Sequence, residues 1–264
     1  MLLLAAFATA VLGAVCGIGG GILLKPLLDA FSGMDAATAS FLSGCTVLSM
    51  AAVSLLRGFA RGKDAQKLNF RVCALLSTGA VFGGLLGRQL FHWLARDISG
   101  GVAGSMQSAA ILLMCAAVLA YLSAKERIRP RGIRHPVPIT GAGLALGTLS
   151  AFLGIGGGPL NHVALSFLFG MDTKTSAANS LLIVFFAQAA SLAGTVCTAS
   201  WPAFDWCALP LMCAGGALGG FAGSAIAKRA GQRQVEWALR GALVLMIGVS
   251  AYNMIRFLTA APTA

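Results

Sequence analysis

Charged residues are scarce in this 264-residue chain, in which Asp, Glu, Lys and Arg together make up 10%. An average soluble domain carries about 25% charged residues, so an ordinary soluble protein is excluded. Hydrophobic residues reach 58%, and the mean hydropathy is +0.84. Apolar runs recur from Met1 to Leu258 with short polar breaks. Because a bilayer-spanning helix needs about 20 apolar residues, we expect almost the whole chain to be embedded in a membrane.

Acidic residues are the rarer of the two charge types, with 8 Asp+Glu against 19 Lys+Arg and a formal net charge of +11. In a soluble protein this balance would favour nucleic acid as a partner. Here the basic residues fall mostly between apolar runs, which is typical of the cytoplasmic loops of membrane proteins. The sequence therefore predicts a multi-pass protein of the plasma membrane (the bacterial inner membrane) that contacts lipid and no nucleic acid.

Enzymatic motifs are also missing. Neither glycine run completes G-x-G-x-x-G, because Ile22 and Pro159 occupy the last glycine position, and there is no Walker, G-x-S-x-G or H-E-x-x-H run. The three histidines are far apart, and the cysteines lack C-x-x-C spacing, so we expect small buried packing residues at Cys16, Cys45, Cys73, Cys115, Cys197, Cys207 and Cys213. We predict no enzyme activity, no cofactor and no metal site. Transport would then draw on an ion gradient, the substrate gradient or a separate subunit.

The chain repeats itself. The segment GAVCGIGGGILLKPLLDAFSGMDAATAS returns as SAFLGIGGGPLNHVALSFLFGMDTKTSA without a gap. A weaker echo pairs Gly83-Gly84-x-x-Gly87 with Gly219-Gly220-x-x-Gly223. We predict one membrane domain made of two repeats, residues 1–123 and 137–264, joined by a basic cytoplasmic linker at 124–136.

Each repeat reads as an apolar segment that carries the glycines (Leu2–Phe31; Val137–Phe169) followed by three helices. The expected helices are Ala36–Leu56, Val72–Leu94 and Ser105–Ser123 in the first repeat, and Thr173–Thr195, Cys207–Ala227 and Gly241–Leu258 in the second. The predicted fold class is an all-α polytopic integral membrane protein. If the glycine segments cross fully, the chain has eight crossings and parallel repeats; if they re-enter, it has six crossings and inverted repeats. The inverted arrangement leaves fewer Lys and Arg outside, so we favour it.

The glycine runs predict breaks in their helices, since each interior glycine costs roughly 0.5–1 kcal/mol relative to alanine. Inside a bilayer an open backbone is tolerable only when it is buried in protein or lines a wet cavity. A helix that resumes after the break directs N–H groups and a positive dipole end at that cavity, which suits an anion. Close helix packing through G-x-x-x-G is the alternative. The anion cradle assigns substrate binding to Gly17, Gly19, Gly20, Gly21, Gly154, Gly156, Gly157 and Gly158.

Polar residues near the glycines extend this candidate site. Lys25 follows Gly21 by one helical turn, and His162 holds the equivalent place in the second repeat. A cation inside an apolar run is costly and marks a functional site, although Lys25 could instead snorkel to an interface and His162 could be hydrogen-bonded in the core. We add Lys25, His162, Asn161, Asn179 and Ser180 as substrate-binding candidates. The candidates for proton coupling are His162, Asp35 and Asp172, the aspartates standing also where helix N-caps belong.

The doubled Gly-Ile-Gly-Gly-Gly, its spacing to Gly-Met-Asp, and Asn179-Ser180-Leu181-Leu182 resemble the TauE/SafE family of sulfite-exporter-like transporters over essentially the whole chain. The resemblance implies a secondary transporter, an exporter, of small anions such as sulfite, sulfonates or related organic anions. It would work by alternating access around the two breaks, as a monomer or a homo-oligomer. Two alternatives stay open: a membrane scaffold or assembly protein that transports nothing, and a thiol-based intramembrane oxidoreductase that rests only on the cysteines.

Overall fold

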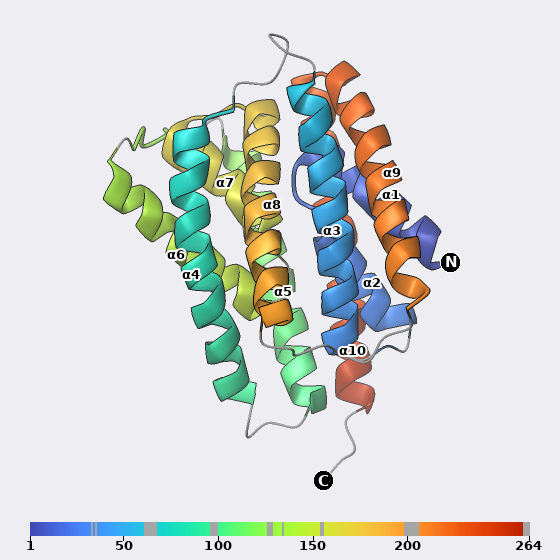
Figure 1. The fold of residues 1–264 in the computed structure, drawn as a ribbon. Helices are drawn as coiled ribbons and strands as arrows, with labels where there is room; N and C mark the ends of the chain where they lie inside the picture. Colours follow the sequence, from blue (N-terminus) through green and yellow to red (C-terminus); the bar gives the residue numbers. More distant parts are fainter. Residues whose placement is uncertain are drawn as a thin grey trace.

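The computed structural model describes residues 1–32, 34, 36–60, 68–95, 100–125, 129–133, 135–153, 156–197 and 206–260, and within them all regular structure is helical. The helices (Figure 1) are α1 (Leu2–Cys16), α2 (Gly21–Phe31), α3 (Ala36–Phe59), α4 (Phe70–Ala95), α5 (Gly100–Ala124), α6 (Pro136–Leu153), α7 (Gly158–Phe169), α8 (Thr173–Cys197), α9 (Ala208–Arg229) and α10 (Gln232–Ala260). Seven of them, all except α1, α2 and α7, are long and apolar enough to cross a membrane. The all-α polytopic fold is confirmed.

One predicted helix boundary is wrong by two turns. The last helix begins at Gln232 instead of Gly241, because the polar stretch between them has too little hydropathy to reveal a helix. Its inward face is apolar nonetheless, since Val235 and Leu239 are buried. On the outward face Arg240 and Glu236 form an ion pair at 2.7 Å, with the i,i+4 spacing that supports a helix.

The cysteine prediction is partly wrong. Cys16, Cys73 and Cys115 are buried as expected, but Cys197 and Cys207 are exposed. Both exposed cysteines lie at the ends of α8 and α9, where hydropathy alone did not distinguish a helix end from a core position. No disulfide joins any of the seven cysteines, all of which lie in the described part of the chain.

Glycines fix the closest helix pairs. α4 packs on α6 so tightly that a Cβ on Gly83 would stand 2.0 Å from the carbonyl oxygen of Leu144. The pair α9 and α1 repeats the pattern, where a Cβ on Gly219 would stand 2.6 Å from the carbonyl oxygen of Phe7. Small residues allow such approaches between membrane helices. Each close pair joins a helix of one half to a helix of the other, so the two halves interlock.

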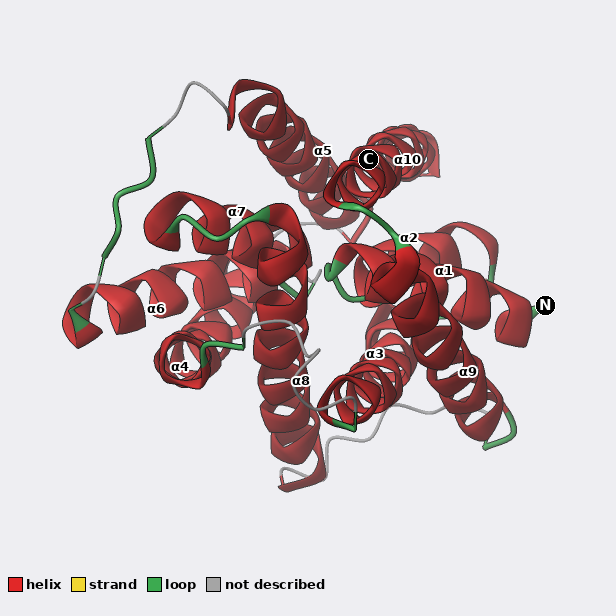
Figure 2. Cartoon of the chain, turned by 90° about the horizontal axis from the view of Figure 1, so that it is seen from above, coloured by secondary structure: helices red, strands yellow, loops and turns green. Residues whose placement is uncertain are grey.

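The same contacts give the helix directions. Gly79, Gly83 and Gly87 face Thr140, Leu144 and Thr148 in that order, so α4 and α6 run in the same direction. Gly215, Gly219 and Gly223 likewise face Leu3, Phe7 and Val11, so α9 and α1 run in the same direction. Seen from above, α3 and α8 lie between the α4–α6 side and the α1–α9 side (Figure 2).

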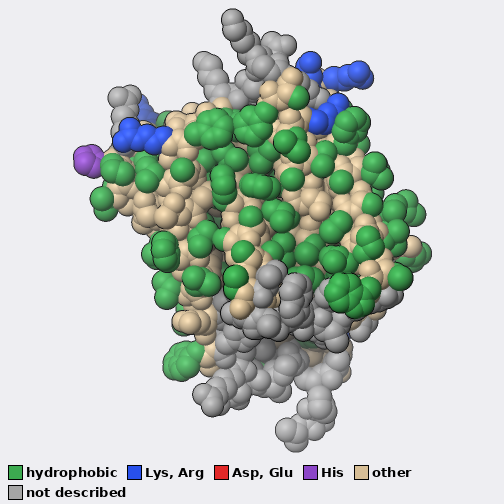
Figure 3. Space-filling model, in the orientation of Figure 1, with side chains coloured by type: hydrophobic (Ala, Val, Ile, Leu, Met, Phe, Trp, Pro, Cys, Tyr) green, Lys and Arg blue, Asp and Glu red, His purple; other side chains and the backbone are tan. Residues whose placement is uncertain are grey.

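Hydrogen bonds gather several helix ends at one end of the molecule, which we call the basic end. Lys125 Nζ, just after α5, donates to Thr173 at 3.1 Å, and Lys174 Nζ donates to the carbonyl of Ala230 at 2.9 Å. On the face in Figure 3, Lys and Arg side chains collect at this end above a largely hydrophobic surface. By the ends of the helices that carry them, its described basic residues are Arg57, Arg71, Lys125, Arg129, Arg131, Lys174, Lys228, Arg229, Arg233 and Arg240, whereas Arg88 and Arg256 lie toward the opposite end.

Candidate functional site

Both glycine runs interrupt a helix as predicted. α1 ends at Cys16 and α2 begins at Gly21, with φ of 71° at Gly17 and 72° at Gly19. α6 ends at Leu153 and α7 begins at Gly158, with φ of 69° at Gly156 and 82° at Gly157. These left-handed conformations are readily adopted only by glycine. Gly154 lies outside the described residues. The segments 17–20 and 156–157 are called the first break and the second break below.

The first break lies at mid-depth, between the two central helices. A Cβ on Gly19 would contact Val184 at 3.2 Å and Val47 at 3.6 Å. Val47 stands halfway along α3, and Val184 stands halfway along α8. The chain also folds back here, because the backbone of Gly20 packs against Thr9, well before the end of α1.

The two breaks meet each other. A Cβ on Gly158 would stand only 1.5 Å from the carbonyl oxygen of Ile18, so the start of α7 rests directly on the first break. Gly17 in turn packs on α8, where its Cβ would stand 2.3 Å from Cα of Ala177. Packing by G-x-x-x-G, the alternative to a cradle, therefore accounts for part of the glycine pattern. The positive φ angles at Gly19, Gly156 and Gly157 need a further reason, because packing alone does not require them.

One hydrogen bond recurs at equivalent positions of the two halves. Ser43 Oγ on α3 donates to the carbonyl of Gly21 at 3.5 Å, and Ser180 Oγ on α8 donates to the carbonyl of Gly158 at 3.4 Å. Both bonds are long and therefore weak. They place Ser180 beside the start of α7. They also bring in Ser43, which the repeat pairs with Ser180 but which is not among the site residues predicted from the sequence.

The backbone N–H groups around both breaks have no hydrogen-bond partner within the described part of the chain. They belong to Ile18, Gly19, Gly20 and Gly21 at the first break and to Gly156, Gly157, Gly158 and Leu160 at the second. The amides that do pair come later, as Leu24 does with the carbonyl of Gly20 at 2.9 Å. Two helix N-termini with free donors and positive dipole ends thus start at one central place.

Polar side chains surround the second break. Ser150 Oγ would stand 2.7 Å from a Cβ on Gly157, and Asn161 Nδ2 would stand 3.4 Å from it. Ser150 Oγ and both ring nitrogens of the fully buried His162 have no hydrogen-bond partner among the described residues. No hydrogen bond from the described residues therefore supports the alternative of a core-bonded His162. Ser150 was missed by the sequence reasoning, because a lone serine in an apolar helix gives no signal.

Gln188 is a further polar residue at this level. Its Nε2 lies 2.9 Å from the position of a Cβ on Gly156, and its Oε1 lies 3.5 Å from that of a Cβ on Gly44 in α3. Its side chain therefore extends from α8 past the second break toward α3. Gln188 is not among the site residues predicted from the sequence.

Lys25 is buried near the first break, 8% exposed, and no hydrogen bond or ion pair joins it to the part of the chain that is described. Asp29 follows one turn later on the same helix. Asp29 was missed, although an acidic residue inside an apolar run is itself a signal. α2 leads from the breaks toward the opposite end and α7 leads toward the basic end (Figure 1), and no hydrogen bond joins Lys25 to His162 within the described residues.

Asn179, on α8, is already hydrogen-bonded. Its Oδ1 accepts from the backbone N–H of Asn69 at 2.8 Å and from Cys73 Sγ at 3.1 Å, while its Nδ2 donates to the carbonyl of Thr175 at 2.8 Å. These bonds join α8 to the start of α4. The structure thus gives Asn179 hydrogen bonds that hold two helices together.

Asp172 caps α8 at the basic end. Its Oδ2 accepts from the backbone N–H of Thr175 at 3.3 Å and from Gln232 Nε2. Partial burial raises the pKa of this carboxyl, but the hydrogen bonds from Thr175 and Gln232 outweigh that effect and lower the pKa below its usual value. Asp35, the other aspartate considered for capping or proton coupling, lies outside the described residues.

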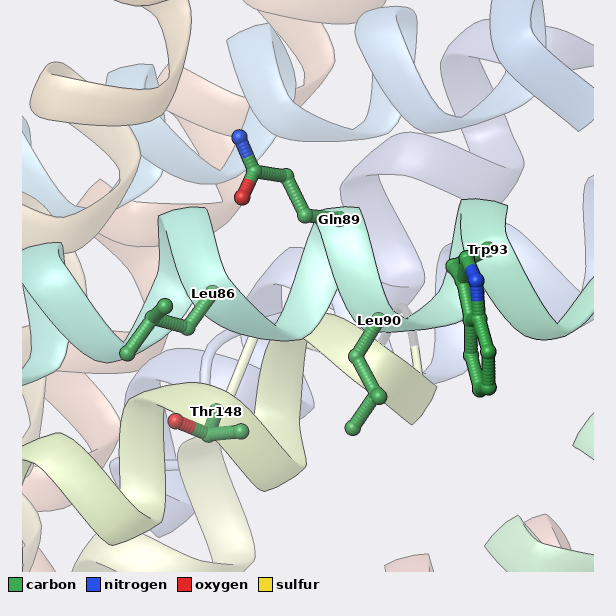
Figure 4. Close-up of a pocket in the computed structure, with 5 residues that line it drawn as sticks. All are labelled: Leu86, Gln89, Leu90, Trp93 and Thr148. Carbon is green, nitrogen blue, oxygen red and sulfur yellow. The ribbon is translucent and has the colours of Figure 1, made fainter.

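A shallow depression on the outer surface contains none of the predicted site residues. It lies where α4 passes α6 (Figure 4), and there Leu86 and Leu90 extend toward Thr148 while Gln89 extends from the other side of α4. Three of its five lining residues, Leu86, Leu90 and Trp93, are exposed apolar side chains on a helix that is long enough to cross the membrane. Nothing in this lining suits an anion.

The chain matches the model of one protein family, described as sulfite exporter TauE/SafE, over residues 2–254. No curated protein and no solved structure matches the chain.

Proposed function

This chain belongs to the sulfite exporter TauE/SafE family, and we propose that it carries small anions such as sulfite, sulfonates or related organic anions across the bacterial inner membrane, as an exporter. The family and the seven apolar helices support a multi-pass membrane transporter. The observation that carries the finer proposal is the contact between the two breaks, where Gly158 rests on Ile18 and the N–H groups on both sides have no hydrogen-bond partner among the described residues.

The proposed site binds the anion by backbone. Helix N-termini stabilise negative charge through their unpaired N–H groups and their dipole. Two such ends that meet between α3 and α8 would surround an oxyanion without fixed cations. The glycines are needed because side chains would block the approach of the ligand to the backbone. Ser150, Asn161, His162 and Gln188 would add hydrogen bonds from the second half and from α8.

We propose further that each glycine segment is a re-entrant hairpin and that the repeats are inverted. α1, α2 and α7, with 15, 11 and 12 residues, are too short to cross a core of about 30 Å at 1.5 Å per residue. α6 is longer, with 18 residues, but α7 after it leads back toward the basic end, where the linker before α6 also lies (Figure 1). The turn between α9 and α10 lies at the basic end together with the start of the linker, whereas the eight-crossing alternative puts them on opposite sides. Basic residues on the cytoplasmic side fit this arrangement. Alternating access would then open the breaks to one side at a time.

The transport proposal is tested by counterflow of radiolabelled sulfite, sulfonates and carboxylates in proteoliposomes. Gly20→Val and Gly157→Val should abolish counterflow while the protein still inserts in the membrane, because valine needs space that Thr9 and Ser150 occupy. Gly84→Val is the matched control, since a Cβ there meets no atom within 4 Å. Transport at wild-type rates by both break variants would refute the cradle.

The topology is tested with single cysteines in a background that lacks the others. Gln232→Cys and Gly132→Cys should react with an impermeant maleimide from the same side, and the native exposed Cys207 should react from the other. Labelling of Gln232→Cys from the side opposite to Gly132→Cys, with Cys207 on the same side as Gly132→Cys, would restore the eight-crossing arrangement.

A further inference from the structure

The imidazole of His162 is the most isolated polar side chain of the described structure. Its exposed fraction is 0%, and neither Nδ1 nor Nε2 has a hydrogen-bond partner within the described ranges. A buried polar group without partners costs on the order of 1–3 kcal/mol, and a buried unpaired charge costs far more. Such a group persists when a ligand supplies the missing partner.

The position of His162 identifies where that partner would come from. His162 stands one turn after Gly158, and helical side chains lean toward the N-terminus of their helix. The ring therefore leans toward the second break, where Ser150 Oγ is also unpartnered. This is the place at which the proposed function puts the anion.

The charged groups around α7 do not provide a fixed partner. Lys125 at the end of α5 and Asp172 ahead of α8 both act on His162, with opposite signs, and Lys174 follows on α8. On α5, Tyr121 packs edge-on against Phe167 near the other end of α7, and Cys115 is a buried thiol. α6 contributes no titratable side chain. Lys25 near the first break is opposed by Asp29.

We propose that His162 binds a proton together with the anion, so that the transported unit is a monoanion plus one proton. Without a ligand, the buried ring stays neutral because nothing offsets a positive charge. With an oxyanion at the second break, the imidazolium donates one N–H to an anion oxygen, and opposite charges that are buried together stabilise each other. The proton comes from solvent and leaves with the anion. The inference rests on the proposed function.

Thermodynamic linkage between proton and anion binding determines how strongly the anion affinity depends on pH. When one proton is taken up with each anion, the affinity falls about tenfold for each unit by which the pH rises. Methanesulfonate is the probe, because its own charge does not change between about pH 6 and about pH 8, where imidazoles usually titrate. Its dissociation constant is measured by titration calorimetry on the purified full-length protein, and the proton uptake is counted by repeating the titration in buffers of different ionisation heat.

The wild type should take up about one proton per anion, and His162→Gln should bind with an affinity that no longer changes with pH. His135→Gln is the matched control, since His135 is exposed ahead of α6, and it should keep the wild-type slope. If His162→Gln fails to accumulate, His162→Asn replaces it. Binding by the wild type without proton uptake, or an unchanged slope in the His162 variant, would overturn this inference and leave the anion site standing. No binding of any tested anion would count against the proposed function itself.

Discussion

The two breaks have similar backbones and different side chains. Both meet at the centre with left-handed glycines, and both accept a serine hydrogen bond at the first residue of the helix that follows. Around the second break stand Ser150, Asn161 and His162, whereas the equivalent positions near the first break hold Gly13, Leu24 and Lys25. We infer that the two breaks have different roles in anion binding. Both halves supply N–H groups that bind the negative charge, and the second half supplies the side chains that distinguish one anion from another.

The largest effect on stability is expected when the equivalent first glycines of α2 and α7 are each replaced by alanine. A Cβ on Gly158 would lie 1.5 Å from a backbone oxygen, whereas a Cβ on Gly21 would lie 2.7 Å from a methyl group of Val47, which can rotate away. Gly158→Ala should therefore cost at least about 3 kcal/mol of unfolding free energy and Gly21→Ala about 1 kcal/mol. Denaturant unfolding in detergent measures both, and equal losses would contradict the described contact.

The next contrast separates two asparagines that the sequence placed in one role. Asn179→Ala removes the partner of the Asn69 N–H, so it should lower the unfolding free energy by about 1–3 kcal/mol and leave anion affinity unchanged. Asn161→Ala removes no hydrogen bond within the described structure, so it should lower anion affinity and cost less unfolding free energy than Asn179→Ala. Calorimetric binding and unfolding of both variants decide the point, and the reverse pattern would exchange the two roles.

The smallest effect concerns the cap at Asp172. Asp172→Ala should cost about 0.5–1 kcal/mol of stability at neutral pH, because it removes the acceptor of the Thr175 N–H. The pKa of Asp172 is lowered in the folded state, so its contribution is complete above the unfolded pKa of about 3.9 and is lost as the pH falls through the folded pKa. The melting temperatures of wild type and variant should therefore converge in acid. A difference that stays constant down to about pH 3 would contradict the role of the carboxylate.

The repeat, the helix breaks and most of the membrane helices could be predicted from the sequence, because glycine runs and hydropathy determine local structure and can be read directly in the residues. The sequence could not show that Gly158 rests on Ile18, since that contact joins residues far apart in the chain. It also treated Asn161 and Asn179 alike, because a side chain's partners, such as Asn69 and Cys73, appear only after folding. The start of α10 was missed for a different reason, as its polar residues hide a buried apolar face.

The central claim is that backbone N–H groups of both breaks bind the anion, and the most direct test measures the hydrogen exchange of these amides. Hydrogen exchange of the full-length protein is measured by mass spectrometry, with and without an anion that the protein transports in counterflow. If the N–H groups of both breaks bind the anion, peptides that span residues 17–22 and 156–161 should both exchange more slowly when the anion is present, because hydrogen-bonded amides are protected. Peptides from α9 should be unaffected. Unchanged exchange in both breaks at a saturating anion concentration would contradict the account.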